Sequence, residues 1–164
     1  SVYFGAGVLN MRSHSAGRFT VKDIGRVCGI CHDAGVKAYL TLNSVMFDGD
    51  REMLCSTLEQ AASQGIDAVI ACDPIVLMRA RERGVPVHLS TQLNISNLEA
   101  LRFYAPYADV AVLARELNLD QVKDICKGIA REDVRGVSGR PIRIEMFCHG
   151  ALCMAVSGKW RSKL

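Results

Sequence analysis

Six short extended segments alternate with helical segments along this chain, and the alternation restricts the fold more than any other feature. The expected strands are Val2–Gly5, Val36–Asn43, Asp67–Cys72, Val87–Gln92, Ala108–Ala114 and Ile142–Phe147. Apolar residues at helical spacing predict helices over Val21–Ala34, Asp50–Ser63, Pro74–Arg83, Asn94–Tyr104 and Leu119–Ile129. Strands that alternate with helices in this way predict βαβ units and a parallel sheet.

The first strand is not followed by a glycine-rich phosphate loop, which argues against a nucleotide-binding Rossmann unit. Two α/β architectures remain open, a doubly wound sheet and a (β/α)8 barrel. A TIM barrel needs eight repeats and about 250 residues, whereas this chain has 164 residues and about six strands. As a TIM barrel, it would therefore be incomplete, with about six βα units and both ends missing.

The composition is that of an ordinary soluble globular protein, with 49% hydrophobic residues, 23% charged residues and a net charge of +3. A membrane span needs about 18 consecutive apolar residues, and the sequence contains no such run. Seven cysteines, an odd number spread through the periodic segments, are more typical of reduced thiols than of a disulfide framework. These features predict a cytoplasmic protein.

Polar residues follow the end of each expected strand, where the functional groups of βα proteins gather. The candidate ligand-binding residues are Asn10, Arg12, Thr41, Asn43, Asp73, Gln92, Asn94, Arg115 and Glu116. Arg12 and Arg115 could donate to a carboxylate or a phosphate, and Glu116 and Glu145 could orient them. The alternative is a structural role, in which Asp73 and Asn94 cap helices and Arg115 and Glu116 form salt bridges.

Reactive side chains gather most densely just after the start of the last expected strand. Glu145, His149 and Cys153 are the candidate catalytic residues, and Cys153 is also a candidate metal ligand. A thiol nucleophile with His149 as its base requires a lowered thiol pKa, which sequence does not show. The alternative is that Cys148 and Cys153 are small buried hydrophobic residues and that His149 is a hydrogen-bonded turn residue.

One other motif suggests a cofactor, because the segment Cys28–His32 has the C-x-x-C-H pattern of c-type haem attachment. Both of its cysteines fall on the apolar face of an expected amphipathic helix. Haem attachment also requires export, so we reject this interpretation.

The segment from Glu145 to Trp160 resembles the signature of peptidase family U32, which reads E-x-F-x-H-G-A-L-C-x-x-x-S-G-x-C. Every fixed position is met except the last, where Trp160 replaces cysteine. Similar segments recur in family order at Leu9–Arg12, Tyr39–Asn43, His88–Asn94 and Leu113–Leu117. The resemblance runs from Val2 to Lys159 and implies a single U32-type barrel domain over residues 1–164.

The resemblance also implies an activity. U32 proteins resemble oxygen-independent hydroxylation proteins that act on tRNA or rRNA bases or on ubiquinone precursors, some with prephenate as the oxygen source. Their cysteines, at positions matching Cys153 and Trp160, resemble ligands of an iron–sulfur cluster. Because an indole nitrogen cannot bind iron, we expect this chain not to hold the cluster.

The preferred hypothesis is therefore prephenate-dependent hydroxylation of an RNA base such as a tRNA uridine. RNA and a small carboxylate such as prephenate are the expected partners. Two alternatives remain. One is a collagenase-like peptidase that uses Cys153 and His149, and the other is an inactive fragment or anion-binding module.

Overall fold

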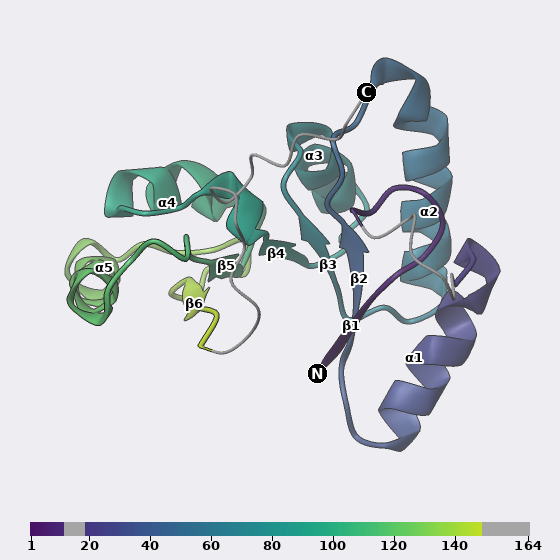
Figure 1. Cartoon of the computed structure of the whole chain (residues 1–164), viewed down its shortest axis with the longest axis horizontal. Coiled ribbons are helices and arrows are strands. Elements are labelled where there is room, and N and C mark those ends of the chain that lie inside the picture. Colours follow the sequence, from purple (N-terminus) through teal and green to yellow (C-terminus); the bar gives the residue numbers. More distant parts are fainter. Residues whose placement is uncertain (12–18, 149–164) are drawn as a thin grey trace. The chain divides into compact units, whose positions relative to one another are not determined.

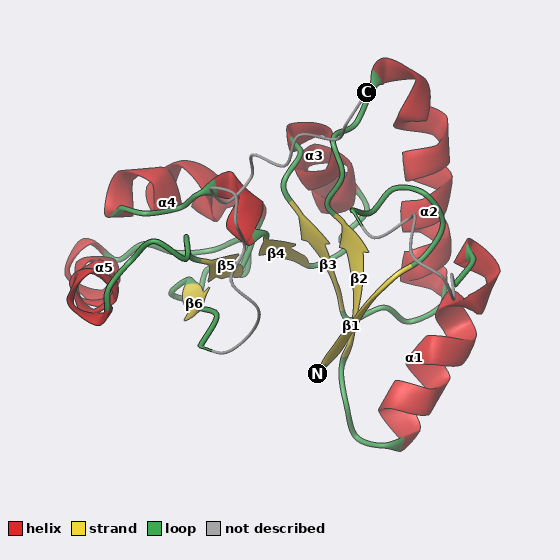
Figure 2. Cartoon of the chain, in the orientation of Figure 1, coloured by secondary structure: helices red, strands yellow, loops and turns green. Residues whose placement is uncertain are grey.

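Strands and helices alternate through residues 1–11 and 19–148, which are the part of the chain that this computed structural model describes (Figure 2). Contacts within the chain define two compact units, Ser1–Val87 and His88–Leu164. The expectation of one domain over residues 1–164 stays a prediction.

The first unit is built on three parallel strands, β1 (Val2–Gly5), β2 (Ala38–Leu42) and β3 (Ala68–Ala71). The central strand β2 pairs with both neighbours, so that Leu40 lies opposite Phe4 on one side and Val69 on the other. Side chains alternate between the two faces of a strand. Leu40 and Leu42 on one face are fully buried, whereas Thr41 on the other is half-buried.

Three helices connect and cover these strands, α1 (Ile24–Asp33), α2 (Arg51–Ser63) and α3 (Pro74–Glu82). Short 3-10 turns at Val21–Asp23 and Asp48–Asp50 lead into α1 and α2. In α1, Ile24, Cys28 and Cys31 are the buried residues, and their helical spacing places them on one face. Figure 1 shows α1 and α2 on the same side of β1 and β2.

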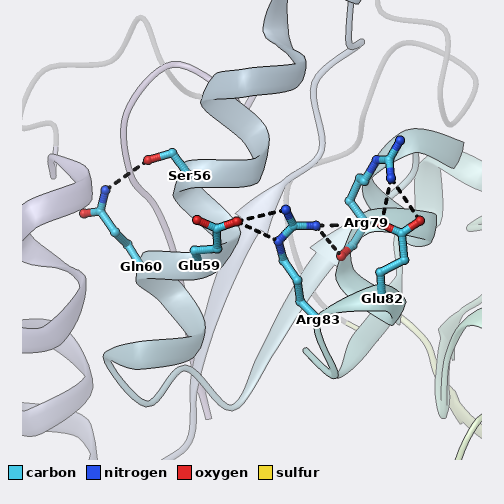
Figure 3. Close-up of polar contacts among 6 residues, drawn as sticks. All are labelled: Ser56, Glu59, Gln60, Arg79, Glu82 and Arg83. Carbon is cyan, nitrogen blue, oxygen red and sulfur yellow. Dashed lines mark hydrogen bonds and ion pairs between the residues drawn. The ribbon is translucent and has the colours of Figure 1, made fainter.

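The outer faces of α2 and α3 are joined by a polar network (Figure 3). Arg83 donates from Nε and Nη2 to Oε1 of Glu59, at 3.3 and 2.9 Å, and from Nη1 to the carbonyl of Arg79 at 3.3 Å. Arg79 donates in turn to both carboxylate oxygens of Glu82. The network therefore ties α3 to α2 on the solvent side of the first unit.

The second unit has the same design. Its parallel strands are β4 (Val87–Leu89), β5 (Val110–Val112) and β6 (Arg143–Glu145), and its helices are α4 (Leu98–Tyr104) and α5 (Leu119–Glu132). Helix α5 begins with a capping box, in which Asn118 and Gln121 exchange hydrogen bonds with each other's backbone N–H groups. Gly128 of α5 faces Leu98 of α4 so closely that a Cβ there would lie 2.7 Å from a leucine methyl carbon.

These observations confirm the predicted α/β class, because every strand pair within each unit is parallel and neighbours follow the order of the sequence. Most element ends differ from the predictions by one to four residues, and two of these differences bear on the candidate site. The strand expected to reach Gln92 ends at Leu89, since Thr91–Leu93 forms a 3-10 turn. The helix expected to start at Asn94 starts at Leu98. In the described residues, no helix combines the length and apolar character that crossing a membrane requires.

Candidate functional site

The described candidate residues of the first unit are Asn10, Thr41, Asn43 and Asp73, and they lie at or just beyond the carboxyl ends of β1, β2 and β3. Asn10 follows β1 and is only 4% exposed. Its Nδ2 donates to the carbonyl of Gly7 at 3.1 Å and to that of Ala6 at 3.5 Å, which holds the loop that leaves the strand. Gly5 makes room for this side chain, because a Cβ at Gly5 would lie 2.6 Å from Cγ of Asn10.

Thr41 and Asn43, at the end of β2, bind backbone atoms of the neighbouring β1 segment. The hydroxyl of Thr41 donates to the carbonyl of Phe4 at 3.1 Å. Oδ1 of Asn43 accepts from the backbone N–H of Met11 at 3.4 Å. Both side chains thus fasten β2 to the chain around β1.

Asp73, at the end of β3, is the helix cap that the sequence suggested as its alternative role. Its Oδ1 accepts from the N–H of Ile75 at 3.1 Å, and Pro74 occupies the first turn of α3. Its Oδ2 accepts from the N–H of Met46 at 3.2 Å, so the same carboxylate also braces the loop after β2. Both oxygens of Asp73 are engaged by backbone donors.

Two thiols in this unit have pKa values unsuited to nucleophilic catalysis. Burial, with a smaller contribution from Asp73, raises the pKa of Cys72 to about 11. Burial also raises the pKa of Cys28, helped by Asp67 and Cys31. Both thiols therefore stay protonated near neutral pH, and a thiolate is the nucleophilic form.

In the second unit, the segment after β4 forms a turn that is fixed by its own hydroxyl groups. Ser90 is 3% exposed; its Oγ accepts from the N–H of Gln92 at 3.3 Å and donates to Oε1 of Gln92 at 3.2 Å. The hydroxyl of Thr91 donates to the carbonyl of Leu113 at 3.2 Å. The turn beyond β4 is thereby tied to the end of β5.

Asn94 does not cap α4, contrary to one of its predicted roles. It adopts the left-handed conformation with a φ of 52°, and its buried Oδ1 accepts no hydrogen bond from the described residues. The cap is Asn97, whose side chain accepts from the N–H of Ala100 at 2.8 Å. Left-handed backbone ends a turn and cannot open a helix, which explains the displacement.

Arg115 and Phe147 lie against each other beyond the ends of β5 and β6. The guanidinium carbon of Arg115 is 4.6 Å from the centre of the Phe147 ring, a cation–π geometry. Both residues are exposed. The backbone N–H of Leu113 donates to the carbonyl of Glu145 at 2.9 Å, so the segments that end β5 and β6 are still paired just before these two side chains. Glu116 is exposed next to Arg115.

Glu145 has a partner that the sequence interpretation missed. Nδ1 of His88, on β4, lies 3.7 Å from Oε1 of Glu145, on β6. This separation is that of an ion pair rather than of a direct hydrogen bond. His88 lowers the pKa of Glu145, burial opposes this effect, and Arg143 adds to the lowering. The signal that could have identified His88 is its position as the single polar residue of the buried strand β4, between Val87 and Leu89.

Three of the predicted site residues, Arg12, His149 and Cys153, lie outside the described residues, and their roles stay predictions. Within residues 1–11 and 19–148, no group of three or more His, Cys, Asp or Glu side chains could hold a metal ion. The residues described do not supply the four converging thiolates that an iron–sulfur cluster requires.

Comparison with known proteins places this arrangement in a family. The model of peptidase family U32 matches residues 1–161. The chain is 57% identical over 159 residues to a protein named collagenase from Porphyromonas gingivalis, covering 97% of this chain and 38% of that protein. It is 33% identical to the 23S rRNA 5-hydroxycytidine synthase of Escherichia coli, covering 97% of this chain and 22% of that protein.

A third relative, tRNA hydroxylation protein P of Helicobacter pylori, is 30% identical over 97% of this chain and 36% of its own length. The chain thus spans less than two fifths of each of these relatives. A solved structure of the U32 peptidase Mk0906 matches with a TM-score of 0.58 at 20% identity, over 76% of this chain and 55% of that one. This likeness confirms the expected fold class, a barrel-type α/β fold of which residues 1–11 and 19–148 supply six strands. The chain belongs to peptidase family U32.

Proposed function

We propose that this chain is part of a cytoplasmic U32 protein that hydroxylates an RNA base without molecular oxygen. The observation that carries the proposal is the exposed pair of Arg115 and Phe147 beside Glu145. Single-stranded RNA bases are recognised by stacking on aromatic rings and guanidinium planes, and the cation of the same pair attracts phosphate. Relatives named for tRNA hydroxylation and for rRNA hydroxycytidine synthesis support this choice of substrate.

In the proposed reaction, these side chains bind the RNA and a small carboxylate, and Arg115 contributes to both. Arg115 and Phe147 bind the target base or its phosphate, and Glu145 accepts a hydrogen bond from an N–H or O–H group of the substrate. A small carboxylate such as prephenate is the proposed oxygen source, for which Arg12 and Arg115 are the candidate donors. We propose no step through an iron–sulfur cluster, since Trp160 occupies a position where the family signature has cysteine.

Mass spectrometry of nucleosides tests the proposal. A host strain that lacks its own copy of the gene is complemented with the wild-type gene, and its tRNA and rRNA are digested to nucleosides. We expect a hydroxylated nucleoside to return with the wild type. Arg115→Ala removes a charge-assisted donor worth about 1.5–3 kcal/mol, so we expect its yield to fall about tenfold or more.

The matched control is Lys127→Ala, which removes a positive charge from an exposed side chain of α5. We expect this variant to restore the nucleoside as fully as the wild type. Equal yields from Arg115→Ala and Lys127→Ala would contradict the proposed role of Arg115. Absence of any hydroxylated nucleoside from the wild-type strain would contradict the function itself. Iron and sulfide are assayed in the purified 164-residue chain, where we expect neither in stoichiometric amount.

A second candidate function is peptide hydrolysis, and the 57% identity to a protein named collagenase favours it. The proposed nucleophile is Cys153 with His149 as its base. Denatured collagen incubated with the purified protein, and with its Cys153→Ser variant, distinguishes the two functions. If the wild type cleaves collagen and the Cys153→Ser variant does not, and RNA nucleosides are unchanged, then proteolysis replaces hydroxylation as the proposed function.

A further inference from the structure

We propose that His88 is a positioning residue for Glu145, holding its carboxylate so that it accepts a hydrogen bond from an N–H or O–H group of the ligand. This inference rests on the proposed function, because it assigns a role at the same site. It adds a residue from β4 to a site whose other described members come from β5 and β6.

The strand register brings the two side chains together. His88 lies opposite Val110 of β5, and Glu145 lies opposite Val112 of the same strand. Val110 and Val112 are two residues apart and therefore share one face of the sheet. His88 and Glu145 thus flank β5 on that face, and Nδ1 and Oε1 approach to 3.7 Å across it.

The two partners differ sharply in exposure. The side chain of His88 is 7% exposed, whereas that of Glu145 is 51% exposed. A ligand can therefore reach the carboxylate while the imidazole stays beneath it. In metal sites, residues that do not touch the metal orient its ligands through a similar contact from behind. Burying an imidazole carries a desolvation cost, which the neighbouring carboxylate offsets.

The charges around Glu145 favour its ionised form. Among the described residues of the three strands, the titratable or charged side chains that share this face with Glu145 are His88 of β4 and Arg143 of β6, which lies opposite Val110. The residues of β5 on this face are valines. His88 lowers the pKa of Glu145 most strongly, burial works against this, and Arg143 assists. An ionised carboxylate only accepts hydrogen bonds, so Glu145 acts as an acceptor or base and not as an acid.

A titration of the Glu145 carboxyl group tests the inference. The carboxyl carbon is followed by NMR in protein labelled at glutamate and is assigned by its loss in Glu145→Gln. In His88→Phe, which keeps a ring and removes the nitrogen atoms, we expect the titration midpoint to rise by about half a pH unit or more. His88→Gln supplies an amide donor, so we expect a smaller rise and a partial return of the hydroxylated nucleoside.

The control is His32→Gln, which breaks the other His–carboxylate pair of the described residues, His32–Asp67. It is expected to leave the midpoint of Glu145 and the nucleoside yield unchanged. An unchanged midpoint in folded His88→Phe, or in His88→Gln if the phenylalanine variant does not fold, would overturn the inference. So would full nucleoside yield from His88→Phe. Failure of the proposed function appears separately, as absence of the nucleoside from the wild-type strain.

Discussion

At the scale of single residues, several candidate ligands of the first unit hold the backbone in place. Asn10 is buried and binds the carbonyls of its own loop, and Asp73 uses both carboxylate oxygens on backbone N–H groups. Such side chains shape a site without necessarily touching its ligand. Their substitution should therefore affect stability before it affects binding.

Gly5 offers a direct measure of this packing. In Gly5→Ala, the new methyl group would lie 2.6 Å from Cγ of Asn10, whose side chain is buried and hydrogen-bonded. Because the amide has little room to move, we expect the free energy of unfolding to fall by about 1–3 kcal/mol. Urea denaturation followed by circular dichroism measures the change.

The matched control for this substitution is Gly29→Ala. Gly29 is an exposed helical residue of α1, and a Cβ there meets nothing within 4 Å. Alanine is favoured over glycine in helix interiors by about 1 kcal/mol, so this variant should be slightly more stable than the wild type. Equal losses in both variants would show that the contact with Asn10 is unimportant.

At the scale of elements, Asp67 connects α1 to two strands. It precedes β3, and its Oδ2 accepts from Nε2 of His32 in α1 at 2.9 Å and from the backbone N–H of Ala38 in β2 at 2.8 Å. Burial raises the pKa of Asp67, but the bonds from Ala38 and His32, together with the charges of His32 and Lys37, outweigh it and lower the pKa overall. One carboxylate thus helps to fix the amino ends of β2 and β3.

This lowered pKa gives the Asp67 contacts a defined pH dependence. Because the folded state favours the ionised form, the stabilisation is complete above the unfolded pKa of about 4 and is lost as the pH falls through the folded value. We expect Asp67→Asn to lose about 1 kcal/mol at neutral pH. The difference from the wild type should shrink below pH 4, as measured by urea denaturation at several pH values. A difference that stays constant with pH would contradict this account.

The alternation of extended and helical segments was enough to predict these elements and their parallel pairing. The strand and helix periodicities of apolar residues are local properties of the chain, so the sequence shows them directly. Their ends were harder to predict. Asn94, Ser96 and Asn97 are all able to cap a helix, and only the left-handed backbone at Asn94 excludes the first of them. The short β4 likewise reflects the turn that Ser90 and Thr91 stabilise, and the partner of Thr91, the carbonyl of Leu113, is too distant in the sequence to be predicted from spacing.

The candidate site was predictable to the same extent. Arg115 was proposed because it follows an expected strand, and Glu145 because it lies near the end of one; the structure places both near the carboxyl ends of β5 and β6. His88 was missed as a partner of Glu145, since their contact depends on strand register across β5. The assignments of Arg12, His149 and Cys153 stay predictions.

At the scale of the whole molecule, the first unit presents apolar residues beside a strand edge. Within the described residues, β1 pairs only with β2, and its side chains Val2 and Tyr3 are 46% and 53% exposed. An apolar groove next to it is lined in part by Phe19, Val27 and Ile30. Unpaired strand edges with exposed apolar side chains promote association between chains.

We therefore expect the 164-residue chain to self-associate when it is expressed alone. Light scattering after gel filtration, at several protein concentrations, measures the effect. Tyr3→Lys places a charge at the strand edge and should shift the population towards monomer, whereas Met78→Lys, at an exposed position of α3, should not. A wild-type monomer at every concentration, with cooperative unfolding, would contradict the prediction.

Some side chains at the strand ends bind the backbone and others are exposed, and this difference affects how such a protein could acquire a new substrate specificity. Substitutions at Asn10 or Asp73 would alter the fold itself, because these side chains form hydrogen bonds with backbone groups. Arg115 and Phe147 are exposed and contact each other through their side chains, so they can be exchanged with less damage to the fold. A randomised library for altered substrate choice is therefore best concentrated on these two positions, with the strand ends of the first unit left constant.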